Sequence, residues 1–137
     1  IIPLFILFSS IIMEMNMSIV VSKFGGTSMG NYEAMSRAAQ ISIERNSSIV
    51  CVSATSGTTD KLIEIAKSAS TGRMEECEKA VFSVKERHTG LLRETQANGE
   101  VEGQLNGLYT ELDLLVQNLS LLKELTPRAY DHILSLG

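Results

Sequence analysis

Apolar and polar residues follow one another in blocks that predict strands and helices in turn. Two short apolar runs, residues 19–21 and 49–52, have the length and the β-branched content of buried strands. A polar turn rich in glycine, serine and threonine follows each run, and apolar residues then recur at helical spacing. The first helix is expected over about residues 32–45, capped by Asn31, with Met35, Ala38, Ala39 and Ile43 on one face. The second is expected to begin near Asp60, with Leu62, Ile65, Ala66 and Ala69 as its apolar stripe.

This alternation of strands and helices predicts an α/β fold with a parallel sheet that helices cover. Both polar turns then fall at the carboxyl ends of their strands, which is where open α/β sheets bind ligands. The two turns are therefore the first places to look for chemistry.

The character of the chain changes after Gly72. Residues 74–96 predict a charged helix, the glycines of 98–103 break it, and leucines recur with helical period over residues 105–122. A last helix is expected over residues 128–136, with Thr126 as N-cap and Pro127 at the first helical position. A coiled-coil interaction element is one interpretation of the leucines. Their wide stripe, shorter than three heptads, favours packing onto the sheet or a helical subdomain.

The first turn has the chemistry of a triphosphate site. Residues 20–28 read Val-Val-Ser-Lys-Phe-Gly-Gly-Thr-Ser. Lys23 brings a positive charge to the turn, while Gly25 and Gly26 let backbone N–H groups approach an anion closely. Thr27 and Ser28 add hydroxyl donors. The lysine precedes the glycines, so the turn is neither a Walker loop nor a dinucleotide-binding fingerprint.

The second turn, residues 53–59, reads Ser-Ala-Thr-Ser-Gly-Thr-Thr. Thr58 or Thr59 is expected to cap the following helix, whose N-terminus favours an anion such as a carboxylate. Taken alone, the turn is better explained as a Ser/Thr-rich loop with an ordinary cap. Its place one helix after the first turn favours a substrate site.

Composition narrows the class of protein. A chain of 137 residues is one domain or part of one, and its net charge of −4 without a basic stripe argues against nucleic acid or an acidic membrane as partner. Two cysteines make no disulfide framework, which fits a reducing compartment. Cys51 is expected to be a buried thiol, and Cys77 looks incidental within a charged stretch. No cysteine stands at metal-ligand spacing from His88 or His132, so we expect structural or exposed roles for both and no metal site.

Residues 1–12 are almost wholly apolar, yet they are too few to span a bilayer. A secretory signal begins with a positively charged region, whereas no lysine or arginine precedes Lys23 here. A membrane or export segment is one interpretation. The preferred one is that residues 1–16 form an apolar prefix, non-native or disordered, upstream of a start at Met13, Met15 or Met17. In this view the protein opens directly with its first strand.

The two motifs together resemble aspartate kinases of the amino-acid kinase family. The Lys-Phe-Gly-Gly-Thr-Ser motif of residues 23–28 resembles the N-terminal motif of those enzymes, and residues 53–59 resemble their Ser-x-x-x-Gly-x-Thr turn. The resemblance covers residues 17–137 and is greatest to the monofunctional, lysine-sensitive branch. It implies the N-terminal part of a three-layer α/β sandwich with a parallel sheet, interrupted by a helical insert at about residues 73–125. A fused homoserine dehydrogenase, as in bifunctional members, remains an alternative.

The resemblance also implies a reaction, which is ATP-dependent phosphorylation of the L-aspartate β-carboxylate in the pathway to lysine, threonine and methionine. Mg²⁺ is expected to accompany the nucleotide, and the parent enzyme is expected to be a cytoplasmic homo-oligomer. The implied ATP-phosphate-binding residues are Lys23, Gly25, Gly26 and Ser28, with Lys23 also catalytic, and the implied aspartate-binding residues are Ser53 and Thr59.

In the family, a glutamate follows the glycine that Gly137 matches, and a later Gly-Gly-Ser-Asp segment holds a catalytic aspartate. Neither is among the 137 residues, so these residues alone are expected to be inactive. The rival hypothesis is a non-catalytic α/β module that binds a nucleotide or a partner.

Overall fold

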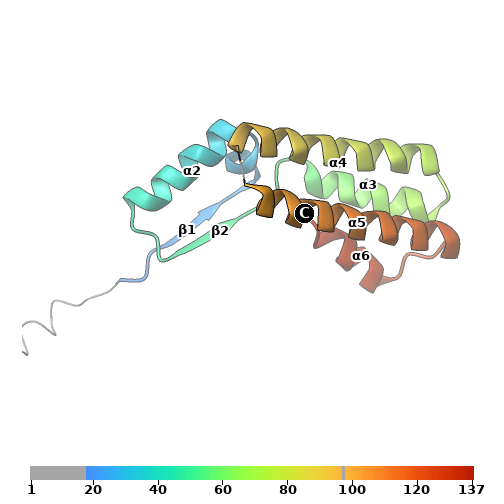
Figure 1. Cartoon of the computed structure of the whole chain (residues 1–137). Coiled ribbons are helices and arrows are strands. Elements are labelled where there is room, and N and C mark those ends of the chain that lie inside the picture. Colours follow the sequence, from blue (N-terminus) through green and yellow to red (C-terminus); the bar gives the residue numbers. More distant parts are fainter. Residues whose placement is uncertain (1–17, 97) are drawn as a thin grey trace, which may run out of the picture.

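A computed structural model describes residues 18–96 and 98–137 (Figure 1). The apolar prefix of residues 1–16 lies outside the described residues. In chain order the elements are β1 (Val21–Phe24), the 3₁₀ turn η1 (Gly26–Met29), α2 (Tyr32–Glu44), β2 (Ile49–Val52), α3 (Thr58–Ser70), α4 (Met74–Thr95), α5 (Gly99–Leu122) and α6 (Pro127–Leu134). None of the helices in the described part of the chain is both long and apolar enough to cross a membrane.

The two strands form a small parallel sheet, as the sequence predicts. Val21 pairs with Ile49 and Phe24 with Val52, and α2 makes the crossover between the strands. Figure 1 shows α2 running beside the strands at one end of the molecule, while the longer helices fill the other end. The fold is thus mostly helical with a two-stranded parallel sheet. The parallel α/β prediction is confirmed at that level.

The prediction that both strands are buried is wrong for the described residues. Val52 is 63% exposed and Val21 is 57% exposed, and all four residues of β2 lie at the surface. Two strands and one helix offer too little surface to cover both faces of a sheet. Cys51 is consequently exposed instead of buried. On α2, Ile43 also faces outward, at 71% exposed.

The core lies instead among α3, α4, α5 and α6. The predicted stripe of α3 is confirmed, because all four of its residues are at most 1% exposed. The other buried members of this core are Cys77, Ala80 and Val84 from α4, Leu112, Val116 and Leu119 from α5, and Ile133 from α6. The leucine-rich region therefore builds a helical subdomain around α3.

Cys77, which looks incidental in the sequence, belongs to this core. It is fully buried, and its Sγ lies 3.8 Å from the carbonyl oxygen of Ile65. The glutamates beside it in sequence point outward, because Cys77, Ala80 and Val84 share the inward face of α4. Burial raises the pKa of the Cys77 thiol.

The helix ends follow local signals in most places. Asn31 accepts a hydrogen bond from the Ala34 N–H at 2.9 Å, and Thr126 accepts one from the Ala129 N–H at 3.1 Å, with Pro127 at the first helical position. The expected break at residues 98–103 is shorter than predicted. Asn98 caps α5 and the helix already includes Gly103, because burial of the leucine stripe outweighs the low helix propensity of glycine.

Candidate functional site

The first turn leaves the end of β1 with its backbone open. Gly25 is extended and exposed, and a Cβ added to it would meet nothing within 4 Å. The chain then tightens into η1, where the Ser28 N–H donates to the Gly25 carbonyl at 3.0 Å. Lys23 is exposed one residue before the end of β1, and among the described residues it makes no ion pair. Its ammonium group is thus available for an anion.

The second turn lies directly beside the first. Ser53 follows β2, and its N–H donates to the Phe24 carbonyl at 3.1 Å. A Cβ added to Gly26 would lie 3.8 Å from the Ser53 Oγ, so this hydroxyl faces the first turn. Further along, the Ser56 N–H donates to the Met29 carbonyl at 3.4 Å. Parallel pairing of the strands therefore brings the two predicted motifs together.

The start of α3 differs from the prediction. The N-cap is Gly57, whose φ of +81° places it in the left-handed region that glycine adopts without strain. Neither Thr58 nor Thr59 is the cap. Thr58 is buried with its hydroxyl bonded to that of Thr55, whereas Thr59 is exposed in the first turn of α3. Of these two threonines, only Thr59 offers its hydroxyl to solvent.

Two residues of α4 reach these turns, and sequence reasoning missed their contacts. The Arg87 Nη2 donates to the Gly30 carbonyl at 2.8 Å, at the end of the first turn. The His88 Nε2 lies 3.2 Å from the Thr55 Oγ1, in the second turn. Both residues stand in a charged helical stretch whose pattern carries no signal for contacts with segments so distant along the chain.

Two further cations line hollows beside β1. Arg37 of α2 lines a hollow of about 220 Å³ together with Thr27 and Ser28. Arg45 lines another of about 270 Å³ together with Lys23. Sequence reasoning singled out neither arginine. Lys23 and Arg37, beside exposed backbone N–H groups, make the carboxyl end of β1 suited to an anion.

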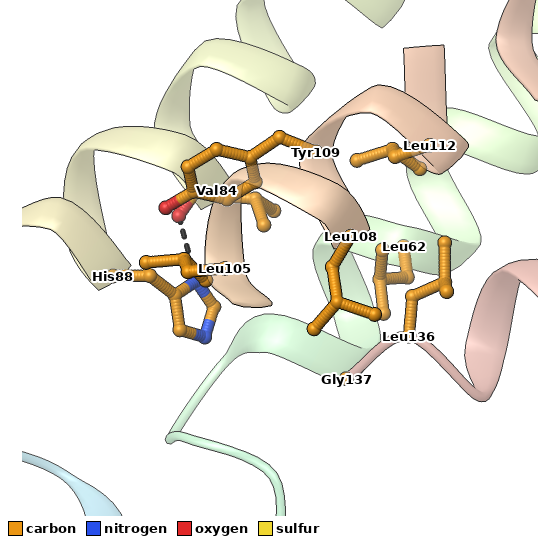
Figure 2. A pocket seen from close by; sticks show the side chains of 9 residues that line it. All are labelled: Leu62, Val84, His88, Leu105, Leu108, Tyr109, Leu112, Leu136 and Gly137. Atoms are coloured by element: carbon orange, nitrogen blue, oxygen red, sulfur yellow. Dashed lines mark hydrogen bonds between the residues drawn. The ribbon is translucent and has the colours of Figure 1, made fainter. Parts of the chain in front are cut away.

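An apolar cavity of about 230 Å³ lies among α3, α4, α5 and the last residues of the sequence (Figure 2). Its lining consists of Leu62, Val84, His88, Leu105, Leu108, Tyr109, Leu112, Leu136 and Gly137. His88 thus borders both the cavity and the second turn. Within residues 18–96 and 98–137, no group of three or more His, Cys, Asp or Glu residues is placed to hold a metal ion.

Comparison with known proteins shows that this chain is similar in sequence to aspartokinases. No family model matches. Lysine-sensitive aspartokinase 3 of Escherichia coli (strain K12) is 30% identical over 125 residues, which are 87% of this chain and 26% of that protein. Chloroplastic aspartokinase 2 of Arabidopsis thaliana is 32% identical over 123 residues, or 85% of this chain and 22% of that protein.

Solved structures agree with the sequences. E. coli aspartokinase III in complex with aspartate and ADP, in the R-state, matches with a TM-score of 0.78 and 26% identity over 88% of this chain and 26% of that one. The T-state complex with lysine and aspartate matches with a TM-score of 0.77 and 27% identity over 87% of this chain and 26% of that one. The sequence homologues of this chain are aspartokinases, and the chain spans about a quarter of their length.

Proposed function

We propose that this chain is the N-terminal part of an aspartate kinase, which transfers a phosphoryl group from ATP to the β-carboxylate of L-aspartate and forms 4-phospho-L-aspartate and ADP. One observation carries the proposal. In a chain whose homologues are aspartokinases, the lysine–glycine turn and the Ser/Thr turn lie side by side at the carboxyl ends of two paired strands. A solved neighbour holds aspartate and ADP together.

In this proposal the first turn binds ATP. Gly25, Gly26 and Ser28 donate to its phosphates, and Lys23 neutralises charge that develops on the transferred group. The open space over Gly25 and the unpaired Lys23 among the described residues suit these roles. Mg²⁺ accompanies the nucleotide. Catalysis then rests on positioning and charge neutralisation, as in other phosphoryl transfers.

The second turn binds aspartate, through the hydroxyls of Ser53 and Thr59. Ser53 faces Gly26, which supports an acceptor carboxylate bound next to the phosphate end of ATP. Thr59 is exposed in the first turn of α3, where backbone N–H groups favour a second carboxylate.

We infer that residues 17–137 belong to a larger three-layer α/β domain, with about residues 73–125 as its helical insert. The exposed apolar strands support this, since further strands and helices would cover them. A Cβ on Gly137 would lie 3.6 Å from that of Ala54, so a residue that followed Gly137 would enter beside the second turn. That is the place expected for the family's glutamate.

The parent protein in this proposal is a cytoplasmic homo-oligomer in the pathway to lysine, threonine and methionine, of the lysine-sensitive branch. A fused homoserine dehydrogenase is the alternative arrangement, and a non-catalytic nucleotide-binding module is the alternative function.

The test uses the full-length protein and two readouts, aspartate-dependent ADP release and trapping of the acyl phosphate by hydroxylamine. We expect both signals with L-aspartate, and a loss of kcat of about a hundredfold or more in Lys23→Ala. Lys79→Ala is the matched control, since this lysine is exposed and pairs only with Glu75 within the described structure. A folded Lys23→Ala protein with normal kcat would overturn the role of Lys23. An inactive wild-type protein that still binds ATP would favour the module.

A further inference from the structure

Arg87 and His88 stand next to each other on α4, and each holds one of the two turns. We propose that they are positioning residues: Arg87 anchors the end of the first turn and His88 anchors the second, so that α4 sets the spacing between the ATP and aspartate subsites. The identity of the two ligands rests on the proposed function, but the two anchors do not. In Figure 1 the later half of α4 approaches α2 and the ends of the strands.

Arg87 binds where the two turns meet. Its Nη2 donates to the Gly30 carbonyl at 2.8 Å, and Gly30 is the residue at which η1 ends. A Cβ on Gly30 would lie 3.1 Å from the Thr27 carbonyl and 3.9 Å from the Ser56 Cβ, so this backbone touches both turns. A charged donor at a carbonyl of this kind makes a stronger bond than a neutral one.

The rest of the Arg87 side chain supports an anchoring role. Its Nε is buried and finds no hydrogen-bond partner among the residues that the structure describes. Among the described residues, the bond to Gly30 is therefore the hydrogen bond that offsets the cost of burying part of the guanidinium group. Its loss would release the turn that carries Gly26 and Ser28.

His88 forms the middle of a directed chain of hydrogen bonds. The Val84 carbonyl can only accept, so the His88 Nδ1, at 2.8 Å, carries the hydrogen (Figure 2). In the neutral ring the Nε2 is then an acceptor, and the Thr55 hydroxyl donates a hydrogen bond to it at 3.2 Å. The Thr58 hydroxyl in turn donates to Thr55 and completes the chain at the first residue of α3.

The two anchors predict separate kinetic effects. Loss of the Arg87 bond frees the first turn, so kcat falls and the KM for ATP rises. Loss of the His88 bond frees residues 53–59, so the KM for aspartate rises more than that for ATP. A merely structural role for either residue would lower the amount of folded enzyme without separating the two KM values.

The experiment uses the full-length protein with paired variants. Arg87→Met removes the donor and Arg87→Lys keeps one, while His88→Leu removes the acceptor and His88→Gln keeps one. We expect changes of about tenfold in Arg87→Met and His88→Leu, and partial rescue in the conservative variants. The controls are Arg93→Met, exposed near the end of α4, and His132→Gln, whose ring contacts Glu111.

Amide hydrogen exchange on the same proteins separates this proposal from the proposed function. Arg87→Met should speed exchange in residues 25–31, and His88→Leu in residues 53–59, with the α3 core unchanged. Exchange that changes as expected in a protein without aspartate-dependent turnover would support the anchors and overturn the proposed function. Normal turnover and normal exchange in both variants would overturn the anchors. If Arg87→Met or His88→Leu fails to fold, the same kinetic and exchange measurements are made on Arg87→Lys and His88→Gln, in which smaller changes of the same direction are expected.

Discussion

The strand end of this molecule (β1, β2 and α2) and its helical end (α3 to α6) differ in how completely they bury apolar side chains. Around α3, four helices enclose a core whose central residues, among them Ile65 and Ala66, are fully buried. Around β1 and β2, apolar residues such as Val52 and Val21 remain more than half exposed. The helical end therefore has a core of its own, whereas the strand end leaves apolar side chains open to solvent. The candidate site lies where the two ends meet.

The largest expected effect concerns residues 1–137 alone and tests whether their strand end is stable and active without further chain. Residues 1–137 by themselves should show no aspartate-dependent ADP release, and their uncovered strands should favour aggregation, because the sheet has open edges and apolar faces. Far-ultraviolet circular dichroism should still report helix. A cooperative, monomeric unfolding transition together with turnover would show that the strand end needs nothing more.

The reactivity of the two cysteines measures the difference in burial between the strand end and the helical end. Cys51 should react with a thiol reagent in the folded chain, while Cys77 should stay unlabelled until denaturant opens the core. The pKa of Cys77 is raised by burial, so its thiolate forms only at higher pH than that of an ordinary cysteine. Mass spectrometry of the labelled peptides decides. Equal rates at both positions would contradict the difference in burial.

Core truncation should cost more at the helical end than at the strand end. Ile65→Ala should lower the free energy of unfolding by about 2–5 kcal/mol, since it removes a fully buried side chain. Val52→Ala in the same chain should cost less than about 0.5 kcal/mol, because its side chain is exposed. Urea unfolding followed by circular dichroism measures both.

The same Val52→Ala change sharpens the comparison in the full-length protein. There its cost should rise to about 1 kcal/mol or more if the added chain covers β2. An unchanged, small cost in the longer protein would mean that the strand surface stays open.

The smallest effect concerns the candidate site, between the strand end and the helical end. In the full-length protein Thr59→Val should raise the KM for aspartate about tenfold and leave the KM for ATP nearly unchanged, because a hydroxyl donor to a carboxylate is lost. Thr71→Val is the control at the other end of α3, where the hydroxyl bonds to the Lys67 carbonyl. A larger change for ATP than for aspartate would show that the two subsites are assigned the wrong way round.

Much of the local structure could be predicted because it depends on short-range patterns. The stripe of α3 and the caps at Asn31 and Thr126 follow from neighbouring residues, and the parallel pairing of the two strands follows from the order strand, helix, strand. The cap of α3 could not, because the choice between Gly57 and the threonines after it depends on how Thr58 is bonded and buried.

By itself, the sequence determined which segments become strands and helices and which two turns carry lysine, glycine and hydroxyl groups, because periodicity and turn chemistry act over a few residues. Tertiary structure decided the rest. It buried Cys77 and exposed Cys51, and it set Arg87 and His88 against turns 57 and 33 residues earlier in the chain. Contacts of that range depend on how whole helices pack, and a side chain in a charged helix carries no local record of the backbone it will meet.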